Sequence, residues 1–256
     1  MAVLLVDIGN TRIKWARFDG GRLGTARAAT HSAWRSGDYR RLFGAGRPLE
    51  RVLVASVAGS RVDRMLAAAA RGAAVPARFV TVPRRAAGVT VGYLEPWRLG
   101  VDRFVAAVGA HHLFKGVATC VVGVGTAMTI DLITAAGLQC GGVIIPAPGL
   151  MVDTLLSSTH GIRRRARGGA LGAAGLFGRS TRAAIVQGSR YAAAATIDRA
   201  VEEASALLGR RPLVVLTGGE AQAVRPLVRS SCVRVPDLVL RGLAVLSEAP
   251  QPRRRH

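Results

Sequence analysis

The stretch VLLVDIGNTRIKWARFDG, residues 3–20, decides the fold class of this chain. Its apolar run at residues 3–6 suits the interior of a strand, and it breaks into Asp-Ile-Gly-Asn-Thr at residues 7–11. Gly-Asn tolerates the positive φ of a tight turn, and extended alternation resumes after it. The stretch therefore predicts two antiparallel strands joined by a short turn.

Asp7, at the end of the first strand, allows two interpretations. The carboxylate could simply cap its own turn within a hairpin. Alternatively, the backbone after Gly9 could approach an anion, Thr11 and Lys14 could add a hydroxyl and a cation, and Asp7 could hold a hydrated metal ion. The second interpretation describes a phosphate-binding hairpin.

The same pattern returns in the second part of the chain. Residues 118–124 form an apolar run that breaks into Gly-Thr-Ala at 125–127, and a second strand follows at 128–133. This recurrence indicates internal duplication, with an N-terminal half at residues 1–115 and a C-terminal half at 116–249. Because no low-complexity linker separates the halves, we expect them to share a cleft.

Strand and helix patterns alternate along the rest of the chain, which favours an α/β sheet fold. We expect further strands at residues 51–57, 78–82, 141–145 and 213–216. We expect helices at residues 61–71, from just beyond residue 103 to 115, at 179–208, and an amphipathic segment at 238–246. Residues 250–256 contain two prolines and no apolar side chain, so this tail is expected to be disordered.

Composition narrows the class of protein. Of the 256 residues, 50% are hydrophobic, which is enough for a sizeable core. The formal charge of +21 suits a polyanionic partner, but it is almost all scattered arginine and could equally reflect a nucleotide bias. Cys120, Cys140 and Cys232 lack metal-type spacing and are expected in the core. Without a signal-peptide pattern or a run of membrane-spanning length, the expected compartment is the cytoplasm.

Two Gly-Thr turns in duplicated halves could hold the phosphates of a nucleotide, and Thr-Gly-Gly at 217–219 could approach its nucleoside. This arrangement resembles the superfamily of acetate kinase, sugar kinases, Hsp70 and actin. The resemblance implies duplicated ribonuclease H-like (actin-like ATPase) domains, each a mixed sheet flanked by helices, with an interdomain nucleotide cleft. The chain has no Gly-x-x-x-x-Gly-Lys-Ser/Thr loop, so a P-loop kinase is excluded.

Within that superfamily, the chain resembles type III pantothenate kinase. The matching stretches run nearly end to end: DIGNTRIKW at 7–15, Tyr93, GVDR at 100–103, GTAMTID at 125–131, GGVIIP at 141–146, FGRSTRAAIVQG at 177–188, TGG at 217–219 and LVLRGL at 238–243. Each pattern is short, but their order and spacing together are specific. The resemblance implies an enzyme that phosphorylates pantothenate to 4'-phosphopantothenate with ATP, the first step of coenzyme A biosynthesis.

The resemblance also implies residue roles. Asp102 matches the general base that takes a proton from the primary hydroxyl of pantothenate, and Asp7 matches a position that helps hold Mg²⁺ through water. The substrate-contacting positions match Tyr93, Gly100, Val101, Arg103 and Thr181. The ATP-binding positions match Asp7, Ile8, Gly9, Asn10, Thr11, Arg12, Ile13, Lys14, Gly125, Thr126 and Thr129.

Several of these residues also have a purely structural interpretation. Asp102 could cap a helix and pair with Arg103, Thr181 could cap the long helix, and Tyr93 could be a core residue. Asp131 could be either functional or only a structural hydrogen-bond acceptor.

The sequence departs from the family at Gly123. Most relatives have an aspartate there, which is associated with an activating monovalent cation, K⁺ or NH₄⁺. Glycine offers no carboxylate oxygen, and a hard cation needs oxygen ligands. Either backbone carbonyls and water replace the carboxylate, or the cation dependence has been lost.

The resemblance further implies a homodimer, because family members build the pantothenate pocket at a subunit interface. A different class of function is a non-catalytic regulatory protein, such as a transcription accessory factor, that retains the fold. The presence of Asp102 and Arg103 favours catalysis over that alternative and makes nucleic-acid binding an unfavoured role. A third class of function is a phosphatase of the same superfamily. A phosphatase would not need the pantothenate-contacting residues, so their presence disfavours it.

Overall fold

The computed structural model describes residues 2–44, 47–170 and 175–249. These residues form two compact units. The first contains the described parts of residues 1–116, 135–140 and 237–256, and the second those of 117–134 and 141–236. The units are therefore not two consecutive pieces of chain, and the halves 1–115 and 116–249 stay a prediction. The expected disordered tail, 250–256, lies outside the described residues.

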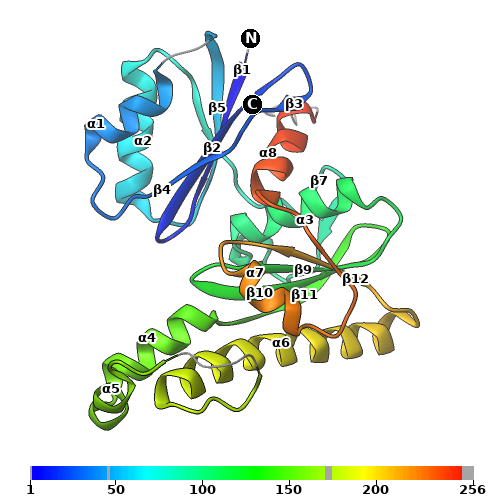
Figure 1. The fold of residues 1–256 in the computed structure, drawn as a ribbon. Coiled ribbons are helices and arrows are strands. Elements are labelled where there is room, and N and C mark those ends of the chain that lie inside the picture. Colours follow the sequence, from blue (N-terminus) through cyan, green and yellow to red (C-terminus); the bar gives the residue numbers. More distant parts are fainter. Residues whose placement is uncertain (1, 45–46, 171–174, 250–256) are drawn as a thin grey trace. The chain divides into compact units, whose positions relative to one another are not determined.

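The first unit is built on a six-stranded sheet (Figure 1). Its strand order is β3 (Arg22–Leu23), β2 (Arg12–Asp19), β1 (Ala2–Ile8), β5 (Leu49–Ser56) and β6 (Ala77–Phe79), and β4 (Arg27–Thr30) also pairs with β2. β1 runs antiparallel to β2, as the opening hairpin predicts, and it runs parallel to β5. β7 (Arg85–Ala86), β8 (Val89–Val91) and the first residues of β11 form a smaller ladder in this unit.

Helices cover the main sheet of the first unit. α2 (Ser60–Gly72) and the short α1 (Ser36–Arg40) pack their apolar side chains on one face, and the core there contains Leu4, Val6, Leu66 and Tyr39. α8 (Leu238–Glu248) packs against β1 and against α3 (Val101–Leu113). Two 3₁₀ turns, Arg41–Phe43 and Pro96–Arg98, complete the unit.

The second unit contains a mixed sheet in the order β13 (Cys232–Arg234), β12 (Leu213–Thr217), β9 (Thr119–Val124), β10 (Ala127–Ile133) and β11 (Leu138–Pro146). The long helix α6 (Thr181–Leu208) packs its buried alanines and Ile197 against this sheet. α4 (Pro148–Ser158), α5 (His160–Ala166), α7 (Ala221–Val224) and the 3₁₀ turn Arg225–Leu227 lie in the same unit.

The expected strands and helices are found, with differences at their ends. The helix expected beyond residue 103 begins at Val101, so Asp102 and Arg103 lie in its first turn. Cys120 is buried as expected, but Cys140 is exposed because it follows the buried Gln139 and so lies on the opposite face of β11, and the core prediction is wrong for that residue. Within the described ranges, no helix combines the length and apolar character needed to cross a bilayer.

Candidate active site

The β1–β2 turn is the first element of the candidate site. Gly9 N donates to Arg12 O at 2.9 Å, which closes the turn, and the ladder places Asp7 directly opposite Lys14. Asn10, Thr11 and Arg12 are exposed, whereas Ile8 and Ile13 are buried beneath them. The buried pair anchors the hairpin while the loop presents its backbone to solvent.

His31 holds this loop in place. It is buried, its Nε2 lies 2.7 Å from Gly9 O, and its backbone N donates to Thr11 O at 3.2 Å. Because a carbonyl oxygen can only accept, Nε2 must carry the proton in this contact. Two contacts from one residue therefore brace both sides of the loop.

Burial raises the pKa of Asp7 from 3.8 to about 7. The Lys14 ammonium lowers that pKa, while the negative charges of Asp102 and Asp237 raise it. Lys14, Asp102 and Asp237 of the first unit therefore lie within electrostatic reach of Asp7. A cluster with excess negative charge favours a bound cation, so the chemistry of these side chains fits Mg²⁺ delivered with a phosphate ligand.

Asp102 lies in the first turn of α3 but does not act as its N-cap. The N-cap position is Gly100, and no side chain caps the helix there. A Cβ on Gly100 would lie 2.7 Å from Asp102 Oδ1, so the absent side chain leaves room for this carboxylate. Val101 is partly buried between the two.

Arg103 and Tyr93 form a linked pair beside Asp102. Arg103 is buried, and its Nη1 donates to Tyr93 Oη at 3.1 Å, with the guanidinium carbon 5.7 Å from the ring centroid. Arg84 in turn donates to Tyr93 O at 2.7 Å and to Leu94 O at 2.9 Å. Tyr93 is thus a partly buried residue on a clamped loop and not a core residue.

The second unit carries the other predicted phosphate loop. Gly125 N donates to Ala127 O at 3.0 Å, and Gly125 and Thr126 are exposed at the tip. Ala147 N donates to Thr126 O at 3.1 Å. Thr129 lies opposite Gly123 in the ladder, and a Cβ on Gly123 would lie 3.1 Å from Thr129 Oγ1.

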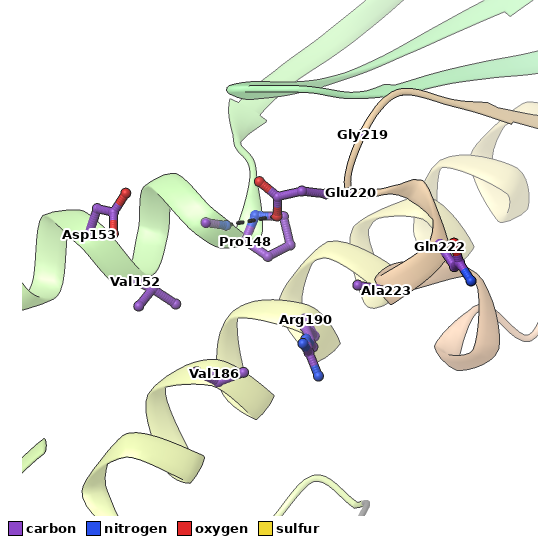
Figure 2. Close-up of a pocket in the computed structure, with 10 residues that line it drawn as sticks. Pro148, Val152, Asp153, Val186, Arg190, Gly219, Glu220, Gln222 and Ala223 are labelled. Atoms are coloured by element: carbon purple, nitrogen blue, oxygen red, sulfur yellow. Dashed lines mark hydrogen bonds between the residues drawn. The ribbon is translucent and has the colours of Figure 1, made fainter. Parts of the chain in front are cut away.

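A cavity of about 500 Å³ lies in the second unit (Figure 2). Its lining comes from α4, α6 and the start of α7: Pro148, Gly149, Val152, Asp153, Val186, Arg190, Gly219, Glu220, Gln222 and Ala223. Glu220 Oε2 accepts from Gly149 N at 2.9 Å, which ties α7 to the first turn of α4. Gly218 has φ +100°, and a Cβ there would lie 2.2 Å from Val124 O, so only glycine allows this close approach.

Thr181 and Asp131 also lie in the second unit. Thr181 is the first residue of α6 and is partly exposed, whereas the helix is capped by Ser180, whose Oγ accepts from Ala183 N at 3.0 Å. The capping interpretation of Thr181 is therefore wrong. Asp131 is buried in β10, where it lies opposite Val121.

Metal-binding clusters are absent from the described residues, where no three His, Cys, Asp or Glu side chains gather closely enough to hold an ion. Mg²⁺ would thus depend on Asp7, water and the ligand's own oxygens, which is a common mode for this ion. Gly123 contributes no side-chain oxygen, so a carboxylate ligand for a monovalent cation is absent at this position.

Sequence reasoning missed four features of the site: His31, Arg84, Asp237 and the cavity of the second unit. Each depends on contacts between residues far apart in sequence. Two signals were available: His31 is a lone histidine in a stretch with no other, and Asp237 follows a proline directly before an apolar helix.

The fold is that of known structures of the actin-like ATPase class. The chain matches (R)-2-hydroxyglutaryl-CoA dehydratase component A from Acidaminococcus fermentans with a TM-score of 0.55 and 13% identity, over 96% of this chain and 95% of that one. It matches a ROK family glucokinase from Streptomyces griseus with a TM-score of 0.53 and 13% identity, over 96% and 99% of the two chains. At this identity the likeness shows the fold alone.

Sequence comparison is more specific. The profile of the type III pantothenate kinase family matches residues 3–203. The chain is 35% identical to the type III pantothenate kinase of Nitrosococcus oceani, over 99% of this chain and 96% of the relative. It is 37% identical to that of Aromatoleum aromaticum, over 96% and 97%. The chain therefore belongs to the type III pantothenate kinase family, a family of phosphotransferases that phosphorylate pantothenate in coenzyme A biosynthesis.

Proposed function

We propose that this chain transfers the γ-phosphoryl group of ATP to the primary hydroxyl of pantothenate, with Asp102 as the general base. The observation that carries this proposal is the placement of Asp102 at the start of α3, over Gly100 and within electrostatic reach of Asp7. Phosphoryl transfer needs alignment and charge neutralisation more than covalent chemistry, so one positioned carboxylate is sufficient as the base.

The substrate side of the site would be formed by Tyr93, Gly100, Val101, Arg103 and Thr181. Arg103 is buried and held by Tyr93, which suits a fixed charge-assisted hydrogen bond to the carboxylate of pantothenate. Gly100 keeps the space that Asp102 needs.

The ATP side would use both loops. In the first unit, the backbone of residues 8–13, the hydroxyl of Thr11 and the ammonium of Lys14 would bind phosphate oxygens, and Asp7 would hold Mg²⁺ through water. In the second unit, Gly125, Thr126 and Thr129 would offer backbone N–H groups and hydroxyls. Mg²⁺, when bound, supplies positive charge that neutralises the phosphates.

The cavity of the second unit is the candidate site for the nucleoside. Its polar side chains, Arg190, Glu220 and Gln222, provide both donors and acceptors for a base or a ribose. The backbone of Gly219, which lines the cavity and has open space beside it, allows a ligand to approach closely. Family members also suggest a homodimer in the cytoplasm, and both remain part of the proposal.

The test is pantothenate-dependent ADP formation from Mg-ATP by the purified chain and by Asp102→Asn. We expect turnover in the wild type and a loss of about 10²- to 10⁴-fold in kcat in the variant, with little change in the dissociation constant for ATP. The matched control is Asp19→Asn, which removes a carboxylate charge from an exposed ion pair with Arg47.

Two outcomes would contradict the proposal. Equal kcat in Asp102→Asn and wild type would remove Asp102 from the role of base. A folded wild-type chain that binds ATP but never turns over pantothenate would favour the regulatory alternative, and salt-dependent binding to DNA would then support that function.

A further inference from the structure

Asp237 has an unusual backbone for its residue type. It lies directly before α8 with φ 54° and ψ 37°, in the left-handed region. In the described part of the chain, only Ala74 and Ala87 share a positive φ among non-glycine residues. Aspartate tolerates this region better than most side chains, but the conformation still has an energetic cost.

The carboxylate of Asp237 is not used to cap α8. Aspartate is a preferred N-cap residue, yet no side-chain capping bond forms at this helix start. Instead, Oδ1 accepts from Lys14 Nζ at 3.1 Å, across 223 residues of sequence. Both side chains are partly buried, at 25% and 30% exposed. The local conformation therefore directs the carboxylate to Lys14 in place of the helix.

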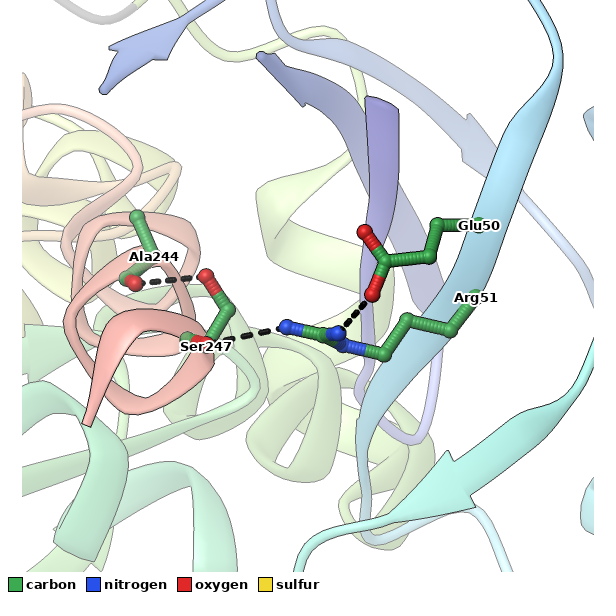
Figure 3. A network of polar contacts seen from close by, with 4 residues as sticks. All are labelled: Glu50, Arg51, Ala244 and Ser247. Atoms are coloured by element: carbon green, nitrogen blue, oxygen red, sulfur yellow. Dashed lines mark hydrogen bonds and ion pairs between the residues drawn. The ribbon is translucent and has the colours of Figure 1, made fainter. Parts of the chain in front are cut away.

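The helix that follows Asp237, α8, contacts its neighbours closely in its middle and near its C-terminal end. A Cβ on Gly242 would lie 1.9 Å from Val105 O, so α8 and α3 meet backbone to backbone. Near the C-terminal end of α8, Arg51 Nη2 donates to Ser247 O at 2.9 Å, and Glu50 pairs with the same guanidinium (Figure 3). The helix that carries Asp237 is thus fixed to the helix that begins with Asp102 and to β5.

Lys14 has three N–H donors, of which Asp237 accepts one. The remaining donors can bind phosphate oxygens if the ammonium is held in one orientation. We propose that Asp237 is a positioning residue that orients the Lys14 ammonium toward the ATP phosphates, an inference that rests on the proposed function of Lys14.

The experiment is a double-mutant cycle. Asp237→Gly and Asp237→Asn both tolerate the left-handed backbone, so they change the side chain without adding strain. Each is measured alone and with Lys14→Met, for kcat, for KM of ATP and of pantothenate, and for Tm. We expect Asp237→Gly to raise KM for ATP about tenfold when Lys14 is present and less than about twofold in the Lys14→Met background. The KM for pantothenate should stay unchanged, and Asp237→Asn, which keeps an acceptor, should recover part of the loss.

Asp19→Asn is the control for the loss of an ion pair elsewhere in the first unit, and it should leave KM for ATP unchanged. Equal effects of Asp237→Gly with and without Lys14, or a lower Tm with unchanged KM, would overturn the proposal because both indicate a structural role only. If the wild type shows no turnover, the proposed function fails, but the inference about Asp237 is still tested. Calorimetric dissociation constants for Mg-ATP across the same variants then test Asp237, with the same coupling expected.

Discussion

In the β1–β2 turn, Asp7 lies opposite Lys14, and in the β9–β10 turn the corresponding pair is Gly123 opposite Thr129. Both pairs are followed by a buried apolar pair, Ile8 with Ile13 and Val124 with Met128, and then by a glycine whose N–H closes the loop. The two turns therefore have the same backbone arrangement. The charges are confined to the first turn, so the second can offer only N–H groups and hydroxyls to an anion.

The largest expected effect comes from removing the charge of the first turn. Asp7→Asn should lower kcat by about 10²- to 10³-fold, because the carboxylate that would hold Mg²⁺ near the phosphates is lost. The comparison variant in the second turn is Thr129→Val, which removes only a hydroxyl and should cost about tenfold or less. Steady-state kinetics at saturating Mg-ATP measure both. A larger loss of kcat in Thr129→Val than in Asp7→Asn would contradict the prediction that the first turn contributes more to catalysis.

The second prediction concerns pH. Since the pKa of Asp7 is about 7, only about a tenth of the free enzyme is ionised there at pH 6. We expect kcat/KM for ATP to rise about tenfold between pH 6 and pH 8 and then to level. Asp7→Asn is the control, because any limb that comes from the titration of ATP itself remains in this variant. A limb as steep in the variant as in the wild type would assign the titration to another group.

The raised pKa of Asp7 also determines whether the folded chain becomes more or less stable as the pH rises. Between 3.8 and about 7, the folded apo chain keeps a proton that the unfolded chain has lost. The bound proton adds to the free energy of unfolding. This added stability is present in full below the pKa of the unfolded state and is lost as the pH rises through the pKa of the folded state. Relative to Asp7→Asn, wild-type Tm should therefore fall from pH 5 to pH 8, and added Mg-ATP should reduce the difference.

The sequence predicts local elements of this molecule better than it predicts their contacts. The apolar runs of β1, β5, β9 and β12 and the alanine-rich helices α2 and α6 are visible because burial leaves a periodic pattern. α4 and α5 were missed, since α4 buries little of its apolar surface beyond Pro148 and so has no clear periodicity.

The candidate site shows the same limit. The sequence predicts Asp7, Lys14, Asp102 and Arg103 as site residues because they lie in motifs of consecutive residues. His31 contacts Gly9 across 22 residues and Asp237 contacts Lys14 across 223, so neither leaves a local signal. Contacts of this kind are set by how strands and helices pack, which local patterns do not encode.

The fourth prediction uses the different supports of the two turns. The first loop is braced by a side chain, His31, whereas the second is braced by the backbone N–H of Ala147. His31→Ala should raise KM for ATP about threefold to tenfold through loss of one hydrogen bond to Gly9 O. His31→Gln, which can still donate to that carbonyl, should lie closer to wild type. Equal losses in both variants would indicate that ring volume matters and the hydrogen bond does not.

The smallest expected effect comes from adding a carboxylate to the second turn. Because Gly123 supplies no side-chain oxygen ligand, we expect wild-type turnover to be the same in K⁺ and in Na⁺ at equal ionic strength. Gly123→Asp adds a carboxylate at this position, and its Cβ fits if Thr129 Oγ1, at 3.1 Å, shifts by a few tenths of an ångström. The variant should then gain K⁺ stimulation of about twofold, while Gly123→Asn, of similar size but uncharged, should gain none. Wild-type stimulation by K⁺ would instead show that carbonyl oxygens and water already bind the cation, and the second turn would then take part in charge neutralisation without any charged side chain of its own.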